Sequence, residues 1–98
     1  MEHVFEVVDK SGRKIHLSNE RWKHILKHNN VNFSHLEDVK SALTRPTHAI
    51  LQAFDKTKGN YYLYNKQMKN YLLVVVKYLN GNGYVITVFF TKNIQNER

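Results

Sequence analysis

Hydrophobic and polar residues alternate in two short stretches near the start of the chain, and this predicts a β-hairpin. Residues 3–8 form the first strand and residues 13–17 the second, with a turn over 9–12 between them. The apolar spacing then changes to three and four, which predicts a helix over 19–28 with Ser18 as its N-cap. The buried stripe of this helix is expected to consist of Trp22, Ile25 and Leu26.

A second helix and a series of strands are predicted to follow. The sequence Ser34-His35-Leu36-Glu37 matches a capping box, so we expect a helix from there to about Leu43, stopped by Pro46. Four antiparallel strands are expected over 47–54, 61–66, 71–79 and 84–92, the last two joined by a turn over 80–83. The third of them should lie centrally, because residues 72–76 are apolar at every position. The predicted class is therefore α+β: an N-terminal hairpin, two short helices and a mainly antiparallel four-stranded twisted sheet.

The length and composition favour one small domain over residues 1–98, with a flexible polar tail at 93–98. Cysteine is absent, which excludes disulfides and thiolate metal sites. The longest apolar run is far too short to cross a bilayer and the N-terminus lacks a signal-peptide pattern. We therefore expect a cytoplasmic protein without a membrane partner.

The net charge of the chain indicates a negatively charged partner. Fifteen Lys and Arg against eight Asp and Glu give a formal net charge of +7. A protein with this charge attracts polyanions and meets them faster. RNA, DNA, an acidic protein and anionic lipid all fit this charge, and the oligomeric state is left open.

Three side chains on the first predicted helix form a candidate site. Arg21, His24 and His28 are spaced by three and four residues and so share one flank, next to the buried stripe. Histidine titrates near neutral pH and can act as acid or base. The alternative is that these are solvated residues at the edge of the stripe. A metal site is disfavoured, because the glutamate of the zinc-protease pattern is missing and no third ligand is evident.

The predicted sheet offers further polar side chains. Tyr62, Tyr64 and Lys66 alternate onto one face of their strand, and Lys77 ends the central apolar strand. Thr87 and Thr91 lie in the last strand, on the same side as Val85 and Phe89 if the alternation is regular. The simpler explanation is that Lys77 reaches solvent and the threonines are ordinary strand residues.

Together these residue types suit cleavage of RNA without a metal. The reaction needs a base for the ribose 2′-OH, an acid for the leaving 5′ oxygen, and cations or hydroxyls at the phosphate. His24 and His28 are the acid–base candidates, with Lys77 and Thr87 at the phosphate. Substrate binding is assigned to Arg21, Tyr62, Tyr64, Lys66 and Thr91, the tyrosines by stacking on unpaired bases. No cofactor is expected.

The order of motifs resembles the phage- and mobile-element-associated nucleases of the barnase–EndoU–colicin–RelE (BECR) fold. The resemblance rests on Arg21-Trp22-Lys23-His24-Ile25 with His28, and on the helix end before Pro46. It continues through three segments of the sheet region, which are 62–66, 74–77 and 87–91. It implies a metal-independent RNA endonuclease, the toxin of a toxin–antitoxin pair, with a cognate antitoxin as partner and the site residues named above.

Two alternative functions remain. Phe90 stands where many relatives of this kind have a tyrosine, and no carboxylate is expected beside the groove. Both points favour a module that binds nucleic acid without cutting it. The second alternative is an adaptor whose basic surface meets an acidic protein. The salt dependence of RNA binding separates these two alternatives.

Overall fold

The computed structural model describes residues 3–52 and 55–94, which form six strands, two α-helices and one 3-10 turn. This confirms the predicted α+β class. Residues 53–54 of the predicted strand 47–54 and residues 95–98 of the predicted tail lie outside the described part of the chain. The elements, in chain order, are β1 (His3–Val8), β2 (Lys14–Ser18), α1 (Asn19–His28), the 3-10 turn (Phe33–His35), α2 (Leu36–Thr44), β3 (His48–Leu51), β4 (Lys58–Asn65), β5 (Asn70–Tyr78) and β6 (Asn82–Thr91).

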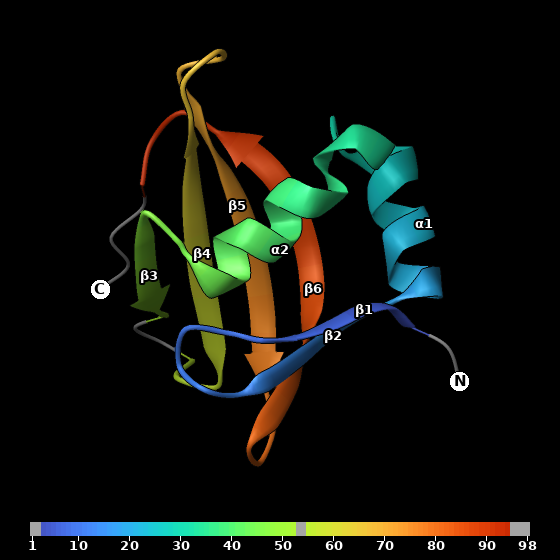
Figure 1. Ribbon diagram of the computed structural model, residues 1–98, viewed down its shortest axis with the longest axis vertical. Coiled ribbons are helices and arrows are strands. Elements are labelled where there is room, and N and C mark those ends of the chain that lie inside the picture. Colours follow the sequence, from blue (N-terminus) through green and yellow to red (C-terminus); the bar gives the residue numbers. More distant parts are fainter. Residues whose placement is uncertain (1–2, 53–54, 95–98) are drawn as a thin grey trace.

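The six strands form one sheet in the order β1-β2-β6-β5-β4-β3 (Figure 1). All neighbours run antiparallel except β2 and β6, which pair in parallel from Lys14–Asn82 to His16–Tyr84. The predicted number of four strands is therefore wrong, because the N-terminal hairpin joins the sheet through β2 and makes it a six-stranded mixed sheet, although most of its strand pairs are antiparallel. Alternation shows which residues share a face of a strand, but not which distant strand becomes the neighbour.

Gly83 permits the close approach of strands at this parallel junction. A Cβ atom at this position would lie 2.3 Å from the main-chain oxygen of Lys77 and 3.1 Å from the Ile15 side chain. The sequence predicted Gly83 as part of a turn, but it belongs to β6, which begins at Asn82. The glycine that the turn itself requires is Gly81, whose φ is +71°.

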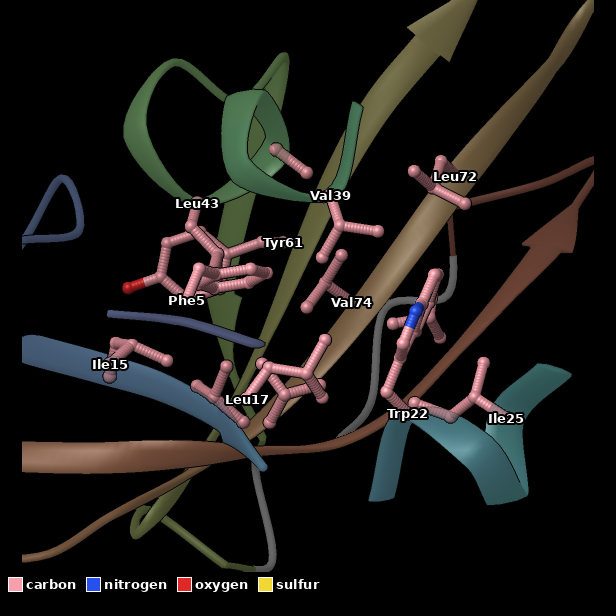
Figure 2. Close-up of a cluster of buried hydrophobic side chains, with 14 of the residues drawn as sticks. Phe5, Ile15, Leu17, Trp22, Ile25, Val39, Leu43, Tyr61, Leu72 and Val74 are labelled. Atoms are coloured by element: carbon pink, nitrogen blue, oxygen red, sulfur yellow. The ribbon is translucent and has the colours of Figure 1, made fainter. Parts of the chain in front are cut away.

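Both helices pack on one face of the sheet, and the hydrophobic core lies between the two layers. Figure 1 shows α2 crossing in front of β4 and β5, and α1 beside β6. α1 has the predicted range and N-cap, since the Ser18 Oγ accepts a hydrogen bond from the Arg21 N–H at 3.1 Å. The side chains that meet in the core include Phe5, Ile15, Leu17, Trp22, Ile25, Val39, Leu43, Leu72 and Val74 (Figure 2).

The second predicted helix is present as α2, but the residues before it are capped differently from the prediction. Ser34 does not cap it; Ser34 lies inside the 3-10 turn, and α2 starts at Leu36. Asn32 caps the turn instead, because its Oδ1 accepts from the Ser34 N–H at 2.9 Å while its own N–H donates to His35 Nδ1 at 3.0 Å. Asn32, two residues earlier, offers the same kind of acceptor as Ser34, so the local sequence did not decide which of the two side chains forms a cap.

Candidate nucleic-acid interface

The face of the sheet opposite the helices, here called the open face, carries most polar side chains of the strands. On β5, Leu72, Val74 and Val76 are buried in the core beneath the helices. Leu73, Val75 and Lys77 therefore point to the open face. The registers of the neighbouring strands continue these positions into rows that cross the sheet.

One row of the open face is rich in ionisable groups and is here called the charged row. It runs through the strand pairings Glu6–His16, His16–Tyr84, Tyr84–Lys77 and Lys77–Lys58. The ring centroids of His16 and Tyr84 lie 6.1 Å apart. Directly paired residues on one face have Cβ atoms about 5 Å apart, so the row brings together an imidazole, a phenol and an ammonium group.

His16 lies in a setting that favours its neutral form. Its ring stacks on His3, with centroids 4.1 Å apart and planes 25° apart. Partial burial lowers the pKa of His16 below its usual value, and the neighbouring His3 lowers it further, while Glu6 acts in the opposite direction. A neutral imidazole can accept a proton near pH 7, as a general base must.

Lys77 is held in place at the other side of the row. Its Nζ donates to Thr57 Oγ1 at 2.6 Å and lies 3.6 Å from Asp55 Oδ2. Lys58 Nζ lies 3.9 Å from the same carboxylate oxygen. Hydrogen bonds from Thr57 lower the pKa of Asp55, and the two lysines add to this effect. Two ammonium groups share one carboxylate, so this end of the row keeps a net positive charge.

A pocket of about 220 Å³ opens on the same face, next to the charged row. Its polar wall contains Gln52 and Asn60, joined by a hydrogen bond of 3.0 Å from Gln52 Nε2 to Asn60 Oδ1. Asn60 is only 5% exposed, whereas Phe89 is 37% exposed at the pocket. The other lining residues are Tyr62, Leu73, Val75 and Thr91.

The predicted helix residues lie in the other layer of the fold. His24 and His28 are exposed on α1, and their ring centroids lie 4.6 Å apart. Arg21 lines a shallow hollow of about 250 Å³ with His24 and the N-cap Ser18. Because α1 packs on the helix side of the sheet, the fold assigns this group and Lys77 to different layers.

Lys66 and Lys77 do not come together. Lys66 lies exposed in the turn that joins β4 to β5, beyond the Asn65–Asn70 pair. Lys77 lies at the other end of the same hairpin, opposite Lys58. A strand rises about 3.4 Å per residue and Lys66 is eight residues after Lys58, so Lys66 and Lys77 are roughly 27 Å apart.

Some of the other predicted sheet residues are exposed and can contact a ligand, whereas others are buried or already hydrogen-bonded within the protein. Tyr64 and Thr91 flank Tyr71 in one row of the open face, and Tyr64 is 42% exposed. Tyr62 is on the same face but fully buried, so it cannot stack on a base in this conformation. Thr87 Oγ1 already accepts a hydrogen bond from Asn29 Nδ2 at 3.0 Å.

Sequence reasoning missed His16, Tyr84 and Glu6. His16 stands between the buried Ile15 and Leu17, so alternation could have placed it opposite the core. His16 lies close to Tyr84 because β2 pairs in parallel with β6, and no local sequence pattern predicts this pairing. Glu6 places a carboxylate in the charged row, whereas the sequence led us to expect none beside the site.

Phe90 points away from the open face. It pairs with Leu72, packs against the core and makes an edge contact with His35 at a centroid distance of 4.9 Å. A hydroxyl group at this position would therefore face the helix layer. The missing hydroxyl does not alter the charged row.

A second polar cluster, outside the open face, is built around the buried Asp9. Its Oδ1 accepts from Ser11 N–H, Ser11 Oγ and Arg13 N–H at 2.6–3.0 Å, and its Oδ2 accepts from Tyr61 Oη at 2.6 Å. The Tyr61 and Tyr78 hydroxyls are hydrogen-bonded at 2.5 Å, and Arg13 lies over the Tyr78 ring. Every oxygen of Asp9 has a donor, so this cluster serves to hold the first hairpin against β4 and β5.

No group of three or more His, Asp or Glu side chains in 3–52 and 55–94 is arranged to hold a metal ion. Within the same ranges, neither helix has the length and apolar character needed to span a membrane. No protein-family model, no curated protein and no solved structure matches the chain.

Proposed function

We propose that this chain is a metal-independent RNA endonuclease whose active site is the charged row of the open face. The observation that supports this most strongly is the adjacency of His16, Tyr84 and Lys77 on three neighbouring strands. Those side chains provide a proton acceptor, a hydroxyl and a cation on one face of a rigid sheet. Cleavage at a ribose 2′-OH needs a base and an acid, together with cations or hydroxyls at the phosphate, and these three side chains supply the base and the phosphate contacts.

In the proposed reaction, neutral His16 takes the proton of the 2′-OH. The 2′ oxygen then attacks the adjacent phosphorus, and the bond from phosphorus to the 5′ oxygen of the next nucleotide breaks. The second imidazole of the stacked pair, His3, protonates that leaving oxygen. The products are a 2′,3′-cyclic phosphate and a 5′-hydroxyl, and the lysines of the row stabilise the charge on the phosphate oxygens.

RNA is favoured as substrate by the charge and by the aromatic content of the open face. The net charge of +7 attracts the phosphate backbone. Tyr64 and Phe89 are partly exposed there and can stack on unpaired bases. The sequence resemblance adds the role of a toxin held in check by an antitoxin protein.

The second proposal is a module that binds RNA on the same face without cleaving it. It is favoured by one contact, since the Lys77 ammonium group is already engaged by Thr57 and Asp55. A lysine fixed in this way contributes charge but is less free to follow a reacting phosphate.

The test compares two matched sets of histidine variants on mixed cellular RNA in EDTA. His16→Ala is expected to lower the cleavage rate at least about 100-fold, as loss of a general base does. The double variant His24→Ala, His28→Ala should keep the rate within about threefold, because both side chains lie in the other layer. Circular dichroism verifies that each variant is folded.

Three results would contradict the proposal in different ways. Loss of cleavage in the helix double variant alone would move the site to α1, where His28→Ala should then lower cleavage much more than RNA binding. Cleavage that EDTA abolishes would point to a metal. A folded parent protein that binds RNA but leaves it intact would support the binding module.

A further inference from the structure

The pocket on the open face lies next to the charged row, two residues away along β5. Val75 belongs to the pocket, and Lys77 of the charged row follows it by two residues on the same face of β5. Two residues of a strand span about 7 Å. A nucleotide whose phosphate contacts the charged row could therefore extend its base into this pocket.

The floor of the pocket is apolar and includes an accessible aromatic ring. Phe89 pairs with Leu73 across β5 and β6, and both line the pocket with Val75. Phe89 is 37% exposed although it lies within a strand of the sheet. An aromatic ring standing on an open sheet is the usual platform for an unpaired base in RNA recognition.

The wall of the pocket offers one donor and one acceptor side by side. The hydrogen bond from Gln52 Nε2 to Asn60 Oδ1 fixes both amides. The other two amide atoms, Gln52 Oε1 and Asn60 Nδ2, take no part in this hydrogen bond. Neither atom has a hydrogen bond to another described residue. Asn60 is nearly buried, so an amide donor there needs a partner from water or a ligand.

We propose that this pocket binds one nucleobase of single-stranded RNA and makes the interaction base-selective. The base stacks on Phe89, and its edge pairs with Gln52 Oε1 and Asn60 Nδ2. The fixed order of this acceptor and this donor makes the pairing selective, because the donor and the acceptor on the base edge stand in one order in A and C and in the opposite order in U and G. This inference rests on the proposed function, in that the charged row holds the neighbouring phosphate. It adds a specificity site that the reaction itself does not require.

The experiment measures fluorescence anisotropy with labelled 2′-O-methyl decamers of A, C and U at one fixed salt concentration. These oligonucleotides cannot be cleaved at the 2′ position, so the measurement reports binding alone. The parent protein should bind one decamer at least about tenfold more tightly than the weakest. Gln52→Ala should reduce this ratio below about threefold, whereas the exposed amide control Gln67→Ala should retain it.

A second variant tests the stacking platform separately. Phe89→Ala should weaken binding of every decamer by about tenfold, because stacking depends little on base identity. Phe33→Ala is the matched control, since Phe33 is 75% exposed in the 3-10 turn and should have no effect. Equal affinity for all decamers, or a preference that survives Gln52→Ala, would overturn the inference.

The two proposals can fail separately. Base-selective binding without cleavage of ordinary RNA would refute the endonuclease and leave the pocket in place. Cleavage with equal affinity for all decamers would refute the pocket and leave the endonuclease in place. Absence of RNA binding by the folded parent protein would overturn both.

Discussion

At the scale of single residues, the hydroxyl of Tyr61 connects the buried carboxylate of Asp9 to Tyr78. Both hydroxyl–oxygen contacts are short, at 2.6 Å and 2.5 Å. Burial, followed by the hydrogen bond to Asp9, raises the pKa of Tyr61 above its usual value of 10.0. Burial also raises the pKa of Tyr78. The folded protein therefore holds these phenolic protons more tightly than the unfolded chain does.

The first prediction concerns alkaline stability. A raised folded-state pKa stabilises the fold at pH values below the unfolded pKa, and this contribution is lost as pH rises from about 10 toward the folded pKa. The free energy of unfolding should therefore fall above pH 10, and Tyr61→Phe should make this fall less steep. At pH 7, Tyr61→Phe should cost about 1–3 kcal/mol, because Asp9 loses a donor.

Urea denaturation at a series of pH values measures both effects. Tyr64→Phe is the control, since its side chain is exposed and should change the unfolding free energy at pH 7 by less than about 0.5 kcal/mol. Equal losses in the two variants would show that the Asp9 cluster does not stabilise the hairpin.

At the scale of elements, one asparagine joins the end of α1 to β6. β2 pairs with β6 only as far as Tyr84, so the outer edge of β6 beyond that point lacks a neighbouring strand among the described residues. Asn29 Nδ2 donates there to Val88 O at 2.6 Å and to Thr87 Oγ1 at 3.0 Å. A side chain thus satisfies an edge carbonyl that would otherwise be free.

The second prediction tests this connection. Asn29→Ala should lower the free energy of unfolding by about 1–2 kcal/mol, because a partly buried carbonyl loses its donor. Hydrogen exchange in β6 should become faster in this variant, particularly after Tyr84. Asn30→Ala provides the matched control. The Asn30 side chain is exposed, so this substitution should change the free energy of unfolding by less than about 0.5 kcal/mol. A neutral Asn29→Ala would show that α1 is held by its apolar stripe alone.

At the scale of the whole molecule, the positive charge is spread over both layers, so net charge alone does not identify the face that binds RNA. The open face has Lys14, Lys58 and Lys77, whereas the exposed side of α1 has Lys23 and Lys27. Only lysines that contact phosphates release counterions when RNA binds. The dependence of affinity on salt therefore distinguishes the two faces.

The third prediction compares two double variants that each remove two positive charges. Lys14→Gln with Lys58→Gln should reduce the slope of log affinity against log salt by about 1.4, at about 0.7 per phosphate contact. Lys23→Gln with Lys27→Gln should reduce it by less than about 0.5. Binding of a short single-stranded RNA is measured between about 50 and 200 mM salt, because affinity changes strongly over this range and the slope can be determined. The reverse order would identify α1 as the RNA-binding surface.

Much of the local structure was predictable from the sequence. The helix over 19–28, its N-cap Ser18 and the central position of β5 are confirmed. These features depend on residues a few positions apart, through helical spacing, capping and continuous burial. The predicted cap of α2 was wrong, because Ser34 lies in a 3-10 turn that Asn32 caps, and the helix itself starts at Leu36 without a side-chain cap.

The candidate site was less predictable because its parts come from distant segments. A bulge in the β5–β6 pairing places Thr87 opposite Val75 and Val85 opposite Val76, so simple alternation fails within β6. Val85 is consequently in the core although alternation grouped it with Phe89. A bulge depends on the partner strand as well as on its own sequence.

The sequence by itself determined the element types, the helix stripe, the positive charge and the kinds of side chain available for chemistry. Only the tertiary structure decided that β2 runs parallel to β6, which brings His16 beside Tyr84 and Lys77. It also separated these residues from His24 and His28 by assigning the two groups to different layers. The reason is physical: local propensity acts over a few residues, whereas strand pairing and layer packing are chosen by burial of the whole core.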